Sequence, residues 1–118
     1  MYGLSPQFDV GVFQGKKLDL LCFSANTLSL SFEDNVSITI MGSIIYRQDP
    51  HEIADKQNIP LLTSNLMSLI DKSVSRADGC EDGTLTLYFD NGHILTLLDD
   101  SRQYESYIIR VGNKEIVV

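Results

Sequence analysis

LSLSFEDNVSITI, residues 28–40, and LTLYFDNGHILTL, residues 85–97, follow one pattern at two places in the same chain. In each stretch, apolar and polar residues alternate on both sides of a short polar insert. That alternation is typical of an antiparallel β-hairpin with one face buried and the other in water. The sequence therefore predicts that this chain contains the same hairpin twice.

The first hairpin has one register in which all its apolar side chains share a face. Phe32 must lie opposite Val36, because only then do the alternating apolar residues of both strands point the same way. The loop is then 33–35, Glu-Asp-Asn. A three-residue loop ends in a left-handed residue, a conformation that Asn35 tolerates.

The second hairpin gives the same answer. Phe89 must lie opposite His93, and the loop is then 90–92, Asp-Asn-Gly, with Gly92 as the left-handed residue. A two-residue Asn-Gly turn is the alternative, but it would send Leu95 and Leu97 to the other face of the sheet. We therefore expect a three-residue loop in both hairpins.

The similarity extends upstream, where Lys16-Lys17-Leu18 and Lys72-Ser73-Val74 each begin a further apolar strand. Each copy is thus predicted to be a three-stranded meander, about residues 17–46 in the first and 72–98 in the second. The first copy ends in a long apolar strand, 36–46. Residues 107–111 and 115–118, around Gly-Asn, predict a closing C-terminal hairpin.

Helix signals lie between the two copies. Asp49 followed by Pro50 and Glu52 is typical of a helix start, and Pro60 interrupts the helix that begins there. A second helix is predicted at about 60–71, with one apolar face that we expect to be buried against the sheet: Leu61, Leu62, Leu66, Leu69 and Ile70.

These elements predict an α+β fold of predominantly antiparallel β-structure. A lone meander exposes its apolar face, whereas two facing meanders bury both, so we expect a sandwich or half-barrel. The 118 residues suffice for a single domain, 1–118. The outward residues of the second hairpin are only partly polar, so either the helix, the C-terminal strands or a partner covers them: Thr86, Tyr88, Ile94, Thr96 and Leu98.

Composition limits the classes of function. The chain is 43% hydrophobic and 21% charged, as in ordinary globular proteins, and it has no apolar run long enough for a membrane span. The N-terminal residues lack the basic and apolar regions of a secretion signal, so we expect a cytoplasmic protein. Cys22 and Cys80 are then expected to be reduced thiols.

The net charge of −7 is concentrated in one segment. Between residues 78 and 105 only Arg102 opposes seven acids: Asp78, Glu81, Asp82, Asp90, Asp99, Asp100 and Glu105. Such a field repels nucleic acid and attracts basic proteins. The other interpretation is that these acids only keep the domain in solution.

Catalytic and metal-binding patterns are weak. His51 and His93 have no metal-ligand spacing around them, and no nucleophile motif or phosphate loop is present, so we expect neither an enzyme nor a cofactor. His93 is expected to be partly buried beside an acid. The acids of 78–83 leave open a calcium-binding or small-ligand module that uses the space between the meanders.

Residues 99–107 link the second meander to the closing hairpin. We expect Tyr104 and Tyr107 to anchor this link, and Glu105 either to satisfy buried backbone donors or to pair with Arg76 or Arg110. Asp99 or Asp100 would accept hydrogen bonds from turn amides.

The ordered motifs resemble one family. They are Gly15-x-x-Leu18, Leu28-x-Leu30-x-Phe32, a helix ending before Val74, Leu85-x-Leu87-x-Phe89-Asp90-Asn91-Gly92, and Tyr104-Glu105-x-Tyr107. Over about residues 11–111 the chain resembles small bacterial proteins built on a duplicated strand-rich unit. That family looks to include immunity proteins of contact-dependent growth inhibition and related polymorphic toxin systems.

The resemblance implies that the protein neutralises a cognate toxin domain by binding it in the cytoplasm. Nuclease toxins, ribonucleases among them, carry basic substrate-binding surfaces, which an acidic inhibitor complements. We therefore expect the partner to contact the acidic segment and the nearby tyrosines, while the oligomeric state stays open: Asp78, Glu81, Asp82, Tyr88, Asp90, Asp99, Asp100, Tyr104 and Glu105.

Overall fold

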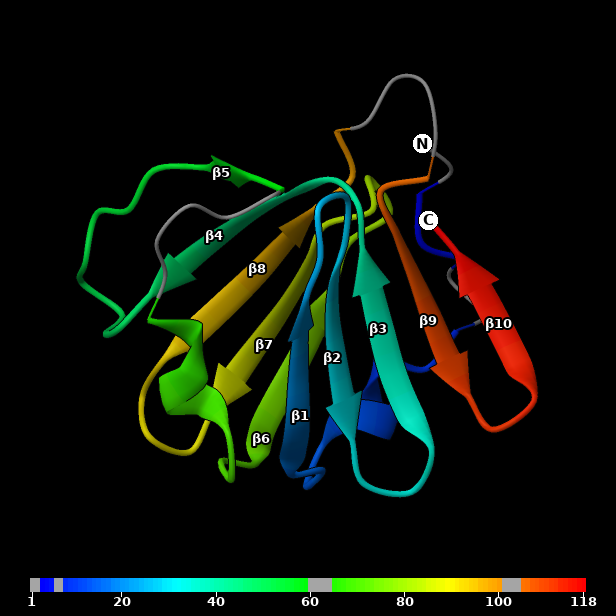
Figure 1. Ribbon diagram of the computed structural model, residues 1–118, viewed down its shortest axis with the longest axis horizontal. Helices are drawn as coiled ribbons and strands as arrows, with labels where there is room; N and C mark the ends of the chain where they lie inside the picture. The colour runs from blue at the N-terminus through cyan, green and yellow to red at the C-terminus, as the bar shows by residue number, and fades with distance from the viewer. Residues whose placement is uncertain (1–2, 6–7, 60–64, 101–104) are drawn as a thin grey trace.

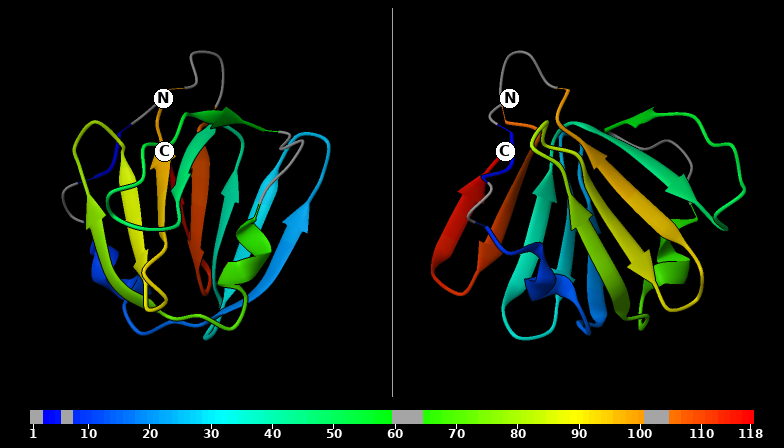
Figure 2. Two further views of the ribbon diagram at one scale, coloured as in Figure 1. Left: turned by 90° about the vertical axis from the view of Figure 1, so that its left-hand side faces the viewer. Right: turned by 180° about the vertical axis from the view of Figure 1, so that it is seen from behind.

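The computed structural model describes residues 3–5, 8–59, 65–100 and 105–118. Within these ranges the chain forms two antiparallel sheets (Figures 1 and 2). The first sheet has the order β1 (Leu18–Phe23), β2 (Leu28–Phe32), β3 (Val36–Ile40), β9 (Tyr107–Val111) and β10 (Lys114–Val117). The second has the order β5 (Gln57–Asn58), β4 (Ser43–Arg47), β8 (Ile94–Leu98), β7 (Leu85–Phe89) and β6 (Val74–Gly79). The prediction of a predominantly antiparallel β fold is confirmed.

Both hairpins have the predicted register. Phe32 pairs with Val36 across β2 and β3, and Asn35 adopts the left-handed conformation with φ of 59°. In the second hairpin the Phe89 amide donates to the His93 carbonyl at 2.9 Å, and Gly92 has φ of 88°. Alternation of apolar side chains therefore determined the pairing, because the other registers would expose them.

The first meander ends earlier than predicted. The expected single strand 36–46 is broken at Gly42, and β4 leaves for the second sheet, where it pairs with β8. The amides of Met41 and Gly42 both donate to the Ser106 carbonyl, at 2.9 and 2.8 Å. A Cβ at Gly42 would lie 3.3 Å from Ser106, so a residue without a side chain permits this close crossing.

The sheets thereby exchange strands. The strand after the first meander, β4, joins the second sheet, and the strand after the second meander, β9, pairs with β3 in the first. Figure 1 shows β8 beside β4 and β3 beside β9. Each half of the chain therefore completes the sheet of the other half.

The helix predicted at 60–71 is wrong over its described part, 65–71. A single 3₁₀ turn, η2 (Leu66–Leu69), is followed by extended Ile70 and by Asp71 with φ of 72°. Leu66 and Leu69 are buried, but Ile70 is 41% exposed. Apolar residues three apart suit a 3₁₀ turn as well as an α-helix, and the chain must then turn into β6. Residues 60–64 lie outside the described residues.

The helix start predicted at Asp49 forms its cap without a helix. The Asp49 carboxylate accepts the His51 amide at 2.7 Å, and the Glu52 carboxylate reaches back to the Gln48 amide at 2.6 Å. Only one turn follows, and the chain then runs to the short strand β5. A capping motif satisfies the first amides but does not by itself offset the cost of nucleating a helix.

The N-terminal turn η1 (Val10–Phe13) matches η2 in detail. The residues that follow, Gly15 and Asp71, are both left-handed, and their amides donate across to Val74 and Leu18 respectively. Leu18 and Val74 in turn donate to the carbonyls of Lys72 and Lys16. These reciprocal bonds surround the Lys17–Ser73 bridge, which joins the sheets where β1 and β6 begin.

The core lies between the two sheets. Its fully buried members come from both halves and include Leu28, Leu30, Leu85 and Leu87 at the inward positions. On the outer face of the second sheet, Ile94 is 4% exposed and lies in register between Arg47 and Tyr88. The expectation that the C-terminal strands cover this face is wrong, because β9 and β10 belong to the other sheet.

Candidate functional site: an acidic rim

Most of the predicted acids come together at one end of the molecule, where β6 and β8 end and β9 begins (Figure 1). We call the solvent-accessible members of this group the acidic rim: Asp78, Glu81, Asp82, Asp100 and Glu105. Three chain segments contribute to the rim. The antiparallel pairing of β6 with β7 and of β7 with β8 brings those segments to the same edge.

The loop 80–84 holds two of the rim acids in place. The Cys80 amide donates to the Thr84 carbonyl at 2.9 Å, and the Gly83 amide donates to the Cys80 carbonyl at 2.9 Å. Asp82 accepts the Thr84 amide at 2.9 Å, and this bond, with a second from the Thr84 side chain, lowers the pKa of Asp82. Asp82 is therefore ionised at neutral pH and held in a fixed position.

Asp99 lies beneath the rim rather than on it. Its side chain is 9% exposed and accepts the Ser106 hydroxyl and the Gly3 amide, both at 2.8 Å. A Cβ at Gly83 would lie 2.3 Å from Asp99, so the carboxylate fits against a residue that has no side chain. The structure thus places Asp99 inside the protein, where it ties the N-terminal segment to β9.

Tyr107 anchors the same region, as predicted. It is fully buried, and its hydroxyl donates to the Gly83 carbonyl at 2.6 Å. Burial, and after it the charges of Asp99 and Asp82, raise the pKa of Tyr107 far above its ordinary value. Tyr104, the other predicted anchor, lies outside the described residues.

Basic residues neutralise part of the rim. Asp78 pairs with Arg76 at 3.2 Å, and Asp100 pairs with Lys56 at 3.1 Å. Arg110 pairs with Glu115 at 3.2 Å, so neither Arg76 nor Arg110 is the ion-pair partner predicted for Glu105. Among the described residues, no ion pair involves Glu81 or Asp82.

Two predicted residues lie outside the rim. Asp90 is at the opposite end of β7, in the loop before β8, and a five-residue strand spans about 17 Å. Tyr88 lies on the outer face of the second sheet, where the Arg76 guanidinium covers its ring at 4.1 Å from the centroid. Asp90 is therefore separated from the rim, whereas Tyr88 adjoins it through Arg76, which also pairs with Asp78.

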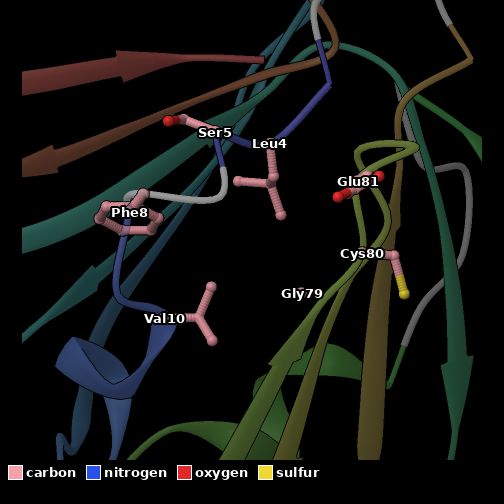
Figure 3. Close-up of a pocket in the computed structure, with 7 residues that line it drawn as sticks. All are labelled: Leu4, Ser5, Phe8, Val10, Gly79, Cys80 and Glu81. Carbon is pink, nitrogen blue, oxygen red and sulfur yellow. The ribbon is translucent and has the colours of Figure 1, made fainter.

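A hollow of about 210 Å³ opens beside the rim, between the N-terminal segment and the end of β6 (Figure 3). It is lined by Leu4, Ser5, Phe8, Val10, Gly79, Cys80 and Glu81. The sequence prediction missed this hollow, because residues 3–10 carry no periodic pattern that places them on a sheet. Leu4, Phe8 and Val10 are apolar, but their spacing fits neither a helix nor a strand, so the sequence carried no signal for this hollow.

A second polar cluster lies at the other end of the molecule, around His93. Its Nδ1 atom is 2.5 Å from the Tyr46 hydroxyl, which is 2.9 Å from the Ser68 hydroxyl. Ser68 donates to the Asn65 carbonyl at 2.7 Å. The acid predicted beside His93 is wrong, since hydroxyls surround its ring instead. Burial is the main cause that raises the pKa of Tyr46.

These contacts indicate which His93 nitrogen carries the proton. If Nδ1 donates to Tyr46, Tyr46 to Ser68 and Ser68 to Asn65, each of the three contacts holds one hydrogen. The opposite tautomer would leave one contact without a hydrogen. Ser68 then serves as a donor to the backbone, so this cluster ties η2 to β4 and β8.

Cys22 and Cys80 are both exposed, with free thiols. Within the described ranges, no group of three or more His, Cys, Asp or Glu side chains is placed to hold a metal ion. No helix in the same ranges is both long enough and apolar enough to cross a membrane. No protein-family model, curated protein or solved structure matches the chain.

Proposed function

We propose that this protein is an immunity protein, which binds a basic bacterial toxin domain through the acidic rim and so neutralises it in the cytoplasm. The resemblance of its motifs to such proteins suggests this role, and the charge favours a basic partner such as a nuclease, with ribonucleases among the candidates. The observation that carries the proposal is the loop 80–84, where Glu81 and Asp82 are exposed and have no cationic partner among the described residues.

Electrostatics supports this choice of surface. A cluster of exposed carboxylates raises the rate at which a positively charged partner associates. The effect becomes smaller as salt screens the electrostatic field. A nuclease must present positive charge to its phosphate substrate. An inhibitor that matches this charge therefore competes directly with the substrate for the same surface.

Preorganisation also supports it. The loop 80–84 is held by its own hydrogen bonds, by Tyr107 and by the close fit of Gly83 on Asp99. A rigid surface loses less conformational entropy when a partner binds. The loop 80–84 is therefore suited to tight binding.

The direct test reverses charge at two rim positions. In the variant Glu81→Lys with Asp82→Lys, we expect association with the cognate basic toxin domain to slow by about tenfold or more at low salt. The salt dependence of the association rate should flatten as well. Stopped-flow or surface plasmon resonance at several salt concentrations measures both.

A matched control carries the same total charge change at the other end. Asp90→Lys with Asp71→Lys alters net charge equally, and both positions are exposed and distant from the loop 80–84. Association should stay within about twofold of the unaltered protein. Equal slowing in both variants would show a non-specific charge effect, and no slowing in either would remove the rim from the interface. Asp99 is unsuitable for such a test because it is buried.

The alternative of a calcium-binding or small-ligand module is tested by a melting experiment. A ligand that binds the native state raises the melting temperature in proportion to the logarithm of its concentration. The space between the meanders is occupied by buried side chains such as Leu30 and Leu87. We therefore expect no rise of the melting temperature with calcium, and a rise that grows with concentration would favour the alternative.

We also propose that the two halves are copies of one unit, joined so that each supplies a strand to the other. The equivalent turns η1 and η2 and the reciprocal bonds around the Lys17–Ser73 bridge support a common origin. The rim belongs to the second copy, together with the start of β9. Duplication would have supplied a stable scaffold on which one end could change its charge.

A further inference from the structure

We propose that the hollow beside Glu81 receives one lysine side chain of the partner, with its alkyl stem against the apolar wall and its ammonium group at the Glu81 carboxylate. This inference rests on the proposed function and adds to it a defined anchor site. The anchor site places the interface at one end of the acidic rim, where the N-terminal segment lies against β6.

The apolar wall of the hollow comes from the N-terminal segment. Leu4, Phe8 and Val10 line one side, and the backbone of Gly79 forms the other (Figure 3). A Cβ at Gly79 would lie 2.9 Å from Val10 Cγ1 and 3.0 Å from Leu4 Cδ1. The absence of a side chain at Gly79 therefore lets Val10 and Leu4 pack closely against the end of β6, where they form the apolar wall beside Glu81.

The wall is held in place from behind. The Gly3 amide donates to the buried carboxylate of Asp99 at 2.8 Å, and η1 packs against β6. Gly3 is left-handed, with φ of 71°, and a Cβ there would lie 2.7 Å from the Glu81 carbonyl. The N-terminal segment thus lies closely against the residue that supplies the charge.

The charge lies at the mouth of the hollow. In Figure 3 Glu81 lies across from Leu4, whereas the sulfur of Cys80 points away from the apolar side chains. Among the described residues that line the hollow, Glu81 is the one with a carboxylate side chain. Asp82 follows it in the chain, so the local field at the mouth is negative.

A lysine side chain matches both features. Its four methylene groups bury against apolar surface while the ammonium stays near water or an acid. A neutral side chain of similar shape, norleucine, keeps the apolar contact and lacks the charge. A carboxylate or phosphate ligand would instead be repelled by Glu81 and Asp82. Charge complementarity therefore selects a basic occupant.

The test uses capped amino acids as probes and the full-length protein. N-acetyl-lysine methylamide is titrated against ¹⁵N-labelled protein, and amide shifts are compared with those caused by the norleucine analogue. We expect shifts centred on residues 79–81 and on Leu4, with the lysine probe binding at least fivefold more tightly than norleucine. Equal affinity of the two probes would overturn the proposal, as would shifts centred elsewhere.

Two variants separate charge from shape. Glu81→Gln removes the charge of an exposed residue, and it should abolish the preference for lysine over norleucine. Asp90→Asn is the matched control and should leave that preference unchanged. Val10→Phe fills the hollow and should weaken both probes at least threefold, provided that circular dichroism and melting show a folded protein. Should Val10→Phe unfold the chain, the result of Glu81→Gln decides alone.

The outcomes also separate this inference from the proposed function. If the probes bind as expected but Glu81→Lys with Asp82→Lys leaves toxin association unchanged, the hollow is a lysine site and the rim is not the toxin interface. If the probes show no preference while charge reversal slows association, the rim binds the partner without this anchor. Either result overturns one proposal and keeps the other.

Discussion

The two three-stranded meanders of this protein, β1-β2-β3 and β6-β7-β8, have the same strand order and differ at one end. In the first half the loop between β1 and β2, residues 24–27, is uncharged, and Ser24 and Thr27 close it through their hydroxyls at 2.7 Å. The equivalent loop in the second half, 80–84, closes through backbone bonds and carries Glu81 and Asp82. The turns that join these equivalent strands differ in length, 24–27 against 80–84, and are neutral in one half and negative in the other.

The buried residues differ far less than the exposed ones. Leu30 and Leu87 take equivalent inward positions and are both fully buried, whereas the outer faces carry serines in one half and Tyr88 under Arg76 in the other. Packing constrains the interior, because a change of one methylene group is felt there. The exposed ends are free of that constraint, so a binding surface can occupy one half alone.

The largest expected effect tests whether the two meanders contribute equally to the core. Leu30→Ala and Leu87→Ala each remove a fully buried side chain from the centre of a meander. Each should lower the free energy of unfolding by about 3 kcal/mol, within the 2–5 kcal/mol typical of such cavities. Urea denaturation measures this loss, and a difference between the two variants above about 2 kcal/mol would break the equivalence.

The next effect compares two left-handed glycines of the second half. Gly83→Ala places a Cβ 2.3 Å from Asp99, whereas the same change at Gly92 meets no atom within 4 Å. We expect a loss of about 3 kcal/mol at Gly83 from overpacking together with strain, and about 1 kcal/mol at Gly92 from strain alone. Melting of the two variants side by side measures the difference, and equal losses would contradict the close fit of Gly83 on Asp99.

Tyr107→Phe tests the anchor beneath the rim. The change leaves the Gly83 carbonyl without its hydroxyl donor and should cost about 1–2 kcal/mol at neutral pH. Ile44 takes the position of Tyr107 in the second sheet, pairing with Leu97 as Tyr107 pairs with Ile40, and has no such bond. A loss below about 0.5 kcal/mol in urea denaturation would show that this hydroxyl does not stabilise the loop.

The pH dependence of stability at alkaline pH should also report on Tyr107. The pKa of Tyr107 is higher in the folded protein than in the unfolded chain, so folding favours its neutral form. This contribution is complete below about pH 10 and is lost as pH rises, at up to about 1.4 kcal/mol per pH unit. Tyr107→Phe should flatten the decline between about pH 10 and 11.5. Tyr46, whose pKa is also raised, should account for part of the decline that remains.

The smallest effect compares the turns η1 and η2. Gly15 and Asp71 hold equivalent left-handed positions, with φ of 81° and 72°. Asp71→Gly should raise the free energy of unfolding by about 0.5–1 kcal/mol through relief of strain, and Gly15→Ala should lower it by about 1 kcal/mol. The Asp71→Gly change also removes the ion pair between Asp71 and Lys17, at 3.5 Å. This pair is exposed, so its loss offsets little of the gain in stability. A loss of stability in Asp71→Gly, seen by differential scanning calorimetry, would show that the two turns are not equivalent.

Hairpins were predictable from the sequence because alternation has a local cause. The side chains of a strand point to opposite faces in turn, so the positions of Phe32 and Val36 specify both the pairing and the loop between them. The helix at 60–71 was not predictable in this way. Apolar spacing at Leu66 and Leu69 suits several turns, and the reversal at Asp71 decided among them.

Candidate-site residues divided in a similar way. The negative charge of the segment 78–105 was evident from composition, but the solvent exposure of each acidic side chain was not. Asp99 and Asp100 are neighbours in the chain, yet one is buried on Gly83 and the other is partly exposed beside Lys56. The hollow beside Glu81 is lined by residues from the segments 4–10 and 79–81, which are about 70 positions apart in the chain. No local sequence pattern links these two segments.

Local alternation and loop composition were enough to specify which strands pair within each meander, where each hairpin turns and which half carries the negative charge. Three features depended on contacts between distant residues: the exchange of β4 and β9 between the sheets, the burial of Asp99, and the hollow beside Glu81. Neighbouring residues determine strand register through short-range geometry. The space around a side chain depends on segments that meet only when the whole chain has folded.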